Sequence, residues 1–92
     1  MRANKVDKNH AEIRDAMREY GATVIDTSSL KNFVDLVVGF NGMTALIEIK
    51  SSSKARFTES QLKLIASWKG GILARIEDVD SAIRLLKTME KT

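Results

Sequence analysis

The strongest constraint on the fold is a pair of apolar runs joined by Asn41-Gly42, in the stretch VDLVVGFNGMTALIEIK. Asn-Gly between two apolar runs is the commonest signal for a tight type I′ turn, which joins neighbouring antiparallel strands. The sequence therefore predicts a β-hairpin with strands at roughly Phe33–Phe40 and Met43–Lys50.

The two-residue turn also fixes which residues face each other across this hairpin. It pairs Phe40 with Met43, Val37 with Leu46, and Asp35 with Glu48. Because side chains alternate between faces along a strand, Lys50 lies on the same face as Asp35 and Glu48. The opposite face carries only apolar side chains and is predicted to be core: Leu36, Val38, Phe40, Met43, Ala45, Ile47 and Ile49.

The charges on the first face need an explanation of their own. Two carboxylates directly across a ladder have Cβ atoms ~5 Å apart and repel each other. A nearby cation can offset this repulsion. Lys50 is one candidate, on a solvated face; a divalent metal is the other, since Mg²⁺ favours sites with one or two carboxylates and several waters. The convergence of Asp35, Glu48 and Lys50 at one end of otherwise apolar strands favours a functional site.

The rest of the chain alternates between helical and strand patterns. An apolar stripe with spacings of three and four predicts a helix, and Thr58 with Gln61 matches a capping box. The predicted elements outside the hairpin are a helix at Asp7–Tyr20, a strand at Ala22–Asp26, a helix opening at Thr58, a strand at Gly71–Ile76 and a helix at Asp78–Lys87. The order α-β-β-β-α-β-α predicts an α/β fold with a mixed central sheet flanked by helices.

Composition narrows the class of protein. The 92 residues are expected to form one domain, 1–92, with a modest core. There is no cysteine and only one histidine, which excludes a thiolate nucleophile, cysteine-bound zinc and a multi-histidine metal site within one chain. The net charge of +3 permits nucleic-acid binding. No apolar run approaches the ~20 residues of a membrane span, and the first ten residues lack a signal-peptide core, so a cytoplasmic location is expected.

The charged residues of the hairpin also match a known pattern. Asp35 followed by Glu48-Ile49-Lys50 resembles the D…(D/E)-x-K signature of the PD-(D/E)XK nuclease superfamily, and the element order is similar to its restriction-endonuclease-like core. Within the superfamily, the small size and the helix with Gln61 resemble VRR-NUC domains, which are similar to Holliday-junction resolvases. Val34 stands where the superfamily pattern has proline, which supplies no metal ligand.

The resemblance implies a role for each matching residue. Asp35 and Glu48 would bind Mg²⁺ or Mn²⁺, and the backbone carbonyl of Ile49 would complete the metal site. Lys50 would orient the attacking water, help to deprotonate it, and stabilise charge in the transition state. Gln61 matches a glutamine that VRR-NUC members place near the site, in addition to its capping role.

Residues outside the hairpin carry weaker indications. Resolvase-like members have a glutamate on the first helix as a further metal ligand, which points to Glu12; an exposed, solvated Glu12 is the equal alternative. Lys54 and Arg56 are candidate phosphate contacts, with Ser52 offering a hydroxyl, against the alternative of a solvated loop. His10 is expected to be a surface residue.

The functional prediction is a divalent-metal-dependent endonuclease that cuts branched DNA such as a Holliday junction, acting as a homodimer. The resemblance places it in a bacterial host cell, with a phage or prophage origin as an option. Two alternatives stay open. One is a non-catalytic DNA-binding or scaffold protein that keeps the nuclease fold, and the other is a restriction-like nuclease acting on linear duplex.

Overall fold

The chain folds into a four-stranded sheet with three helices. The computed structural model describes residues 3–50 and 56–91, with side chains described from residue 9 onward. The elements are α1 (Ala3–Tyr20), β1 (Thr23–Asp26), β2 (Leu36–Phe40), β3 (Met43–Ile49), α2 (Glu59–Ser67), β4 (Ile72–Ile76) and α3 (Val79–Glu90). The strand order is β1-β2-β3-β4, antiparallel except for the parallel pair β3 and β4. The predicted α/β class with a mixed sheet is confirmed.

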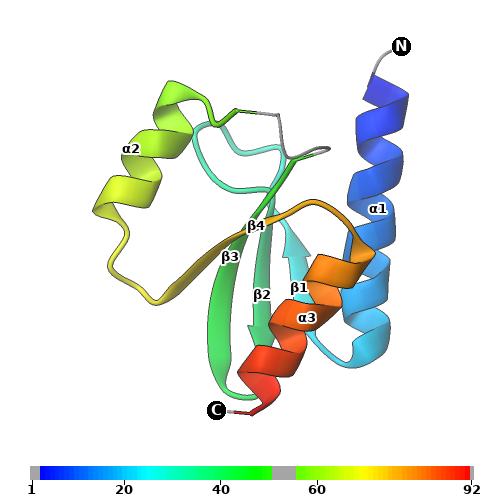
Figure 1. The fold of residues 1–92 in the computed structure, drawn as a ribbon. Helices are drawn as coiled ribbons and strands as arrows, with labels where there is room; N and C mark the ends of the chain where they lie inside the picture. The colour runs from blue at the N-terminus through cyan, green and yellow to red at the C-terminus, as the bar shows by residue number, and fades with distance from the viewer. Residues whose placement is uncertain (1–2, 51–55, 92) are drawn as a thin grey trace.

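The helices are divided between the two faces of the sheet. Helices α1 and α3 lie side by side on one face, and α2 stands over the other (Figure 1). Parallel strands need a crossover connection, and α2 provides it between β3 and β4. None of the helices in the described ranges combines the length and the apolar character of a membrane span.

The hairpin adopts the predicted turn, and the predicted register holds from Phe40 to Leu36. Asn41 and Gly42 have φ angles of 53° and 77°, the positive values that a type I′ turn requires at both central positions. The amide of Asn41 also donates to the Met89 carbonyl at 2.9 Å, which ties the turn to α3. The observed register pairs Phe40 with Met43, Gly39 with Thr44, Val38 with Ala45, Val37 with Leu46 and Leu36 with Ile47.

The core lies between the sheet and the α1–α3 pair. The predicted apolar face of the hairpin supplies its centre, since Leu36, Val38, Ala45 and Ile47 are fully buried. The opposing helices contribute Ile13, Met17, Ala82, Leu86 and Met89, all fully buried as well. Burial on this face holds the hairpin in register, because a one-residue slip would turn these side chains toward the other face.

Three element boundaries differ from the sequence prediction by more than one residue. Helix α1 begins at Ala3, before the predicted start at Asp7. Helix α3 continues to Glu90 rather than ending at Lys87, because Met89 packs into the core and extends the buried stripe by one turn. Strand β2 begins at Leu36 rather than Phe33, because the Asp35 carboxylate, and not a backbone carbonyl, accepts the Ile49 amide.

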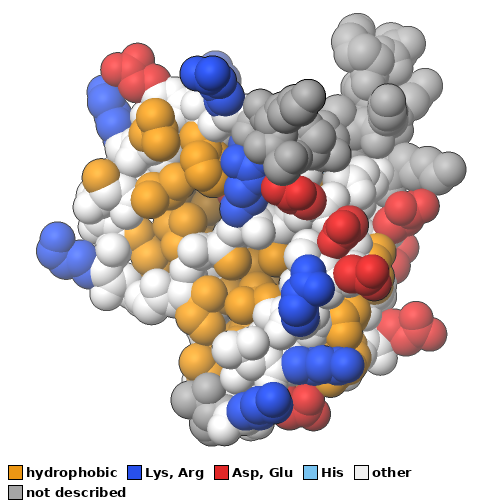
Figure 2. Space-filling view, in the orientation of Figure 1, with side chains coloured by type: hydrophobic (Ala, Val, Ile, Leu, Met, Phe, Trp, Pro, Cys, Tyr) orange, Lys and Arg blue, Asp and Glu red, His pale blue; other side chains and the backbone are white. Residues whose placement is uncertain are grey.

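Helix α2 is the least buried element. Its start is the predicted capping box, in which the Thr58 hydroxyl accepts from the Gln61 amide and the Gln61 side chain accepts from the Thr58 amide. No residue of this helix is buried, and Leu62 and Ile65 are 54% and 37% exposed. Figure 2 shows hydrophobic side chains gathered over α2 and the strands beside it.

Candidate active site

Asp35 lies at the point where the hairpin ladder stops being regular. Its backbone amide donates to the Ile47 carbonyl at 3.0 Å, although Ile47 is already paired with Leu36. Two residues of one strand thus face one residue of the other, as in a β-bulge. The carboxylate then accepts the Ile49 amide at 2.8 Å through Oδ2, in place of a backbone carbonyl. The ladder therefore ends one residue before the predicted Asp35–Glu48 pair, and this is why β2 starts at Leu36.

The backbone around Asp35 is held by Thr27, the residue directly after β1. The Thr27 hydroxyl donates to the Val34 carbonyl at 2.8 Å, and the Thr27 amide donates to the Asp35 carbonyl at 2.9 Å. The bulge consequently has its own hydrogen bonds and is not frayed. Its effect is to turn the Asp35 carboxylate toward the end of β3.

Glu48 is the buried polar residue of the described chain, with 5% of its surface exposed. Its Oε2 accepts a hydrogen bond from the Gln61 side-chain amide. The Lys50 ammonium lies 3.9 Å from the same oxygen. The other oxygen, Oε1, is buried and has no hydrogen-bond partner among the described residues. A buried carboxylate oxygen without a partner is costly, so this atom marks a place where a ligand would be stabilising.

The pKa of Glu48 reflects these surroundings. Burial raises the pKa of the Glu48 carboxyl to about 7, and the neighbouring charge of Asp35 adds to the rise. Lys50 acts in the opposite direction. Burial and a second carboxylate are the two standard ways in which an acidic pKa is raised. The two carboxyl groups are therefore close enough to compete for one proton or one cation.

Lys50 is held between Glu48 and an aromatic ring. Its ammonium lies 5.5 Å from the centre of the Phe57 ring, and the Arg75 guanidinium lies 5.3 Å from the same ring. Both distances are within the ~6 Å over which a cation is attracted to an aromatic face. The Lys50 side chain is 14% exposed. Phe57 thus fixes two cations on the side of the sheet where Glu48 lies.

Gln61 makes both contacts that its sequence position allowed. Its Oε1 accepts the Thr58 amide at 2.8 Å, which completes the capping box, while its Nε2 donates to Glu48. One side chain therefore connects the first turn of α2 to the buried carboxylate. Among the predicted site residues, the structure brings together Asp35, Glu48, Lys50 and Gln61.

Other predicted site residues lie elsewhere. Glu12 is exposed on α1, and the described residues contain no group of three acidic, histidine or cysteine side chains that could hold a metal ion. The role of Glu12 as a further metal ligand stays a prediction. Arg56 is exposed, and its phosphate-contacting role stays a prediction. Ser52 and Lys54 lie outside the described residues, and the metal-binding role of the Ile49 carbonyl stays a prediction.

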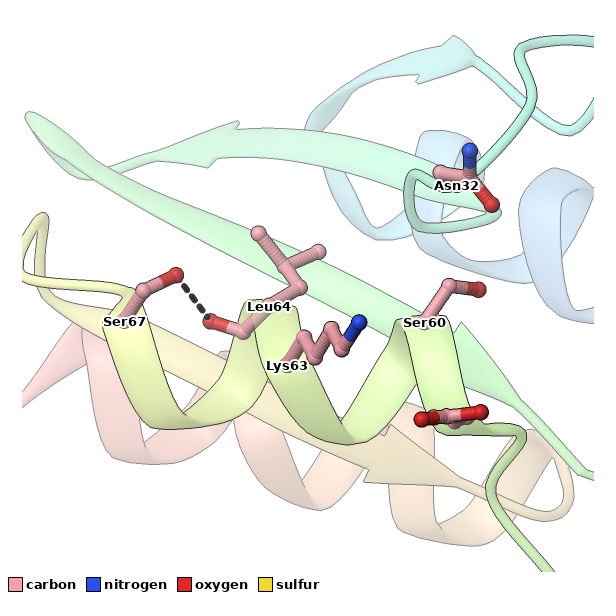
Figure 3. A pocket seen from close by; sticks show the side chains of 6 residues that line it. Asn32, Ser60, Lys63, Leu64 and Ser67 are labelled. Atoms are coloured by element: carbon pink, nitrogen blue, oxygen red, sulfur yellow. Dashed lines mark hydrogen bonds between the residues drawn. The ribbon is translucent and has the colours of Figure 1, made fainter.

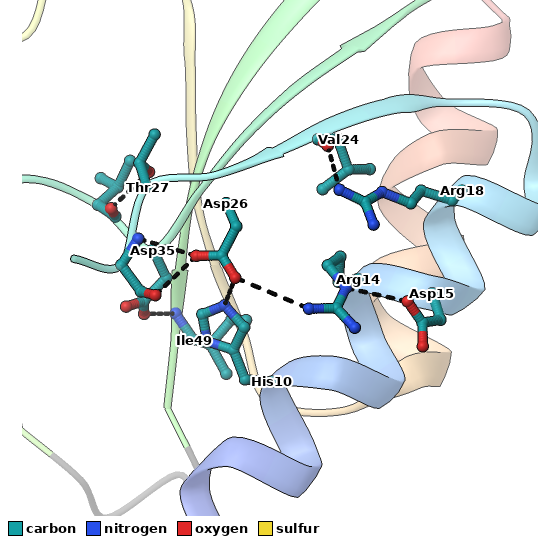
Figure 4. Close-up of polar contacts among 11 residues, drawn as sticks. His10, Arg14, Asp15, Arg18, Val24, Asp26, Thr27, Asp35 and Ile49 are labelled. Carbon is teal, nitrogen blue, oxygen red and sulfur yellow. Dashed lines mark hydrogen bonds and ion pairs between the residues drawn. The ribbon is translucent and has the colours of Figure 1, made fainter. Parts of the chain in front are cut away.

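A second polar cluster occurs where α1 meets the end of β1 (Figure 4). The His10 Nε2 and Arg14 Nη1 atoms lie 3.3 and 3.8 Å from one carboxylate oxygen of Asp26. Ser28 donates to the other oxygen through its hydroxyl and its amide, at 2.6 and 3.0 Å. These two hydrogen bonds are the main reason why the pKa of Asp26 lies below its ordinary value, with smaller contributions from His10 and Arg14.

The prediction of His10 as a surface residue is wrong, because its side chain is only 12% exposed. A signal for this was present in the sequence. His10 precedes Ile13 by three residues and Met17 by seven, so it lies on the buried stripe of α1. The cluster holds β1 against α1, and β1 pairs with β2, which begins directly after Asp35.

The donor set is compatible with a hard divalent cation. Mg²⁺ is bound by one or two carboxylates and keeps several waters, so a group of three protein ligands is not required. Asp35 and Glu48 supply two adjacent carboxylates, and the partnerless Glu48 Oε1 provides an oxygen available for coordination. The residues present therefore fit a two-carboxylate metal site.

Comparisons with known proteins add no relative: protein-family models, curated proteins and solved structures gave no match.

Proposed function

We propose that this chain is a divalent-metal-dependent endonuclease of the PD-(D/E)XK superfamily, of the VRR-NUC type, that cuts branched DNA. The observation that carries the proposal is the state of Glu48, which is buried beside Asp35, contacted by Lys50 and Gln61, and left with one partnerless oxygen. A cluster in which one ammonium faces two carboxylates is unfavourable without a further cation, which is typical of sites built for function rather than for stability. The strand order and the single parallel pair are also compatible with a restriction-endonuclease-like core.

Each side chain of the cluster has a role in phosphodiester hydrolysis. Asp35 and Glu48 would hold Mg²⁺ or Mn²⁺, which supplies Lewis acidity and lowers the pKa of a bound water. Lys50 would orient the attacking water and place positive charge where negative charge develops on the phosphate. Gln61 would keep the Glu48 carboxylate in the orientation that leaves its other oxygen available. Phe57 would hold the Lys50 ammonium at the site.

We also propose that the chain acts as a homodimer. Support comes from α2, a helix of nine residues with no buried residue and with Leu62 and Ile65 exposed. Isolated helices of this length are marginal in water, so covering this face with a second copy would stabilise it. Two copies related by a twofold axis would present two active sites, as symmetric cutting of a four-way junction requires.

The proposal is tested by cleavage of a substrate panel in Mg²⁺ or Mn²⁺. The panel compares a four-way junction, a flap, a splayed arm and a linear duplex. We expect cutting of the branched substrates, and a loss of at least about 100-fold in rate for Glu48→Ala and Lys50→Ala, as for other groups that stabilise transition-state charge. Glu19→Ala and Lys87→Ala are the matched controls, because both residues are exposed on helices away from the site.

Three other results of the cleavage assay would contradict the proposal. Cutting that survives Glu48→Ala would overturn the site assignment. Binding of branched DNA without cutting in either metal would indicate a scaffold protein. Cutting of linear duplex at one sequence, with no preference for junctions, would indicate a restriction-like nuclease.

A further inference from the structure

An open groove runs between α2 and the loop that precedes β2. Its volume is about 510 Å³, and it is lined by Asn32, Glu59, Ser60, Lys63, Leu64 and Ser67. In Figure 3, Asn32 faces the helix from the loop, while Ser60, Lys63 and Leu64 lie along the near side of α2. None of these residues belongs to the cluster around Glu48, so the groove is a separate feature of the surface.

The groove follows one face of the helix. Ser60, Lys63, Leu64 and Ser67 have the spacing of three, four and seven that places side chains on one side of an α-helix. Over seven residues this face extends about 10 Å at ~1.5 Å per residue. A stacked nucleic-acid strand advances ~3.4 Å per nucleotide, so the face matches a segment of about three nucleotides. An open groove of this form suits an extended strand better than an enclosed small molecule.

Helix α2 connects the groove with the candidate active site. Ser60 immediately precedes Gln61, whose side chain donates to Glu48. Leu64 lines both this groove and a small cavity that Glu48 and Gln61 line on the sheet side of α2. A strand that leaves the site along α2 would therefore enter the groove at Ser60 and pass toward Ser67.

The polar groups of the groove fit a sugar-phosphate backbone. Lys63 supplies a cation in the middle of the face, where it can contact a phosphate. Asn32 offers an amide that both donates and accepts, and its φ of 61° is a left-handed conformation that asparagine tolerates better than most residues. Glu59, in the first turn, is the one carboxylate of the lining and would repel a phosphate placed beside it. The expected phosphate contact is thus at Lys63 rather than at the first turn.

From this arrangement we infer that the groove binds the DNA strand that flanks the scissile phosphate, with Lys63 as a backbone contact and Glu59 as a group that weakens binding. The inference rests on the proposed nuclease function and identifies a substrate-binding surface outside the catalytic cluster.

The test uses two charge changes with opposite expected effects on the same helix. A fluorescently labelled four-way junction is titrated with the full chain in Ca²⁺, at several salt concentrations. Lys63→Gln should weaken binding several-fold and lower the slope of log K against log salt by about 0.7–0.9, the value for one phosphate contact. Glu59→Gln should tighten binding.

Matched controls distinguish an effect of the groove on DNA binding from an effect of the net charge of the protein. Lys87→Gln on α3 and Glu19→Gln on α1 change the net charge by the same amounts at exposed positions away from the groove. The inference predicts that each groove variant differs from the wild type by more than its control does. Asn32→Gly, which leaves a backbone conformation that glycine adopts readily, should also weaken binding without lowering the melting temperature.

Two failures can be told apart. If the wild type binds and cuts the junction while Lys63→Gln behaves like Lys87→Gln, the groove inference is overturned and the proposed function stands. If the wild type binds no junction and calorimetry detects no divalent-ion binding, both fall.

Discussion

The buried carboxyl of Glu48 should make the stability of the metal-free protein decrease between pH 4.5 and pH 7.5. Its pKa of about 7 in the folded state lies above the ordinary value of about 4.5 expected in the unfolded chain. The folded state therefore holds the proton more tightly than the unfolded state does. The stability that this proton contributes is fully present below pH 4.5 and is lost as the pH rises through 7. Glu48→Gln, which has no such proton, removes this dependence.

The magnitude follows from the two pKa values. A difference of about 2.5 in pKa corresponds to about 3 kcal/mol, at ~1.4 kcal/mol for each pKa unit. Since Glu48 is 5% exposed, solvent reduces this figure little. In a domain of this size 1 kcal/mol changes the melting temperature by roughly 4–8 °C. The advantage of Glu48→Gln over the wild type should thus grow by on the order of 10–20 °C between the two pH values.

The assay is chemical denaturation with EDTA present, at pH 4.5 and pH 7.5, for the wild type, Glu48→Gln and the exposed control Glu19→Gln. At each pH the free energy of unfolding of the wild type is subtracted from that of the variant. The prediction concerns how this difference changes between pH 4.5 and pH 7.5. Asp26 and Asp78 have lowered pKa values, so their titration reduces the stability of the fold only at lower pH. Because the wild type and the variants share these carboxyls, their effect cancels in this difference. An equal Glu48→Gln difference at both pH values would refute the reasoning, because the carboxyl would then be no more stable protonated than ionised in the fold.

Three further predictions concern the neighbours of that carboxyl. Asp35→Asn removes one of two adjacent negative charges, so calorimetry should show weaker Mg²⁺ or Mn²⁺ binding while the melting temperature in EDTA rises; unchanged metal affinity would contradict the assignment. Phe57→Leu keeps an apolar side chain but removes the ring that lies 5.5 Å from the Lys50 ammonium, so the cleavage rate should fall several-fold with metal affinity unchanged. Gln61→Ala should destabilise the fold at pH 7.5 by more than Thr58→Ala, which costs about 1 kcal/mol through the cap alone; equal losses would mean that the contact with Glu48 adds nothing.

The sequence predicted the hairpin well because its turn and its apolar face are local properties. Asn41-Gly42 selects the turn, and the alternation of apolar residues selects the face that packs on the helices. The register as far as Leu36 followed from these two facts. The bulge at Asp35 did not, because it depends on a side-chain carboxylate taking the place of a backbone acceptor for the Ile49 amide. No spacing rule encodes that exchange.

The helical contributions to the site were harder to predict. Gln61 was found because its cap position and its resemblance to nuclease glutamines pointed to the same residue, and the structure gives it both contacts. On the first helix, the sequence left the ligand and solvated readings of Glu12 equal, and Glu12 is exposed in the structure. The stripe of Ile13 and Met17 instead places His10 on the buried side. The spacing of residues along a helix decides which side chains face the core, and the chemical type of a residue does not decide this alone.

The contact between Gln61 and Glu48 connects the chemistry of the site to the position of α2. Because no residue of α2 is buried, the helix is held by few contacts, and this hydrogen bond is one of them. A hydrogen bond to an ionised carboxylate is roughly twice as strong as one to a neutral group. Any cation that keeps Glu48 ionised should therefore also hold α2 more firmly against the sheet. Since Lys63 and Ser60 line the groove from this same helix, metal binding at the carboxylates would fix one wall of the surface proposed to receive the DNA strand.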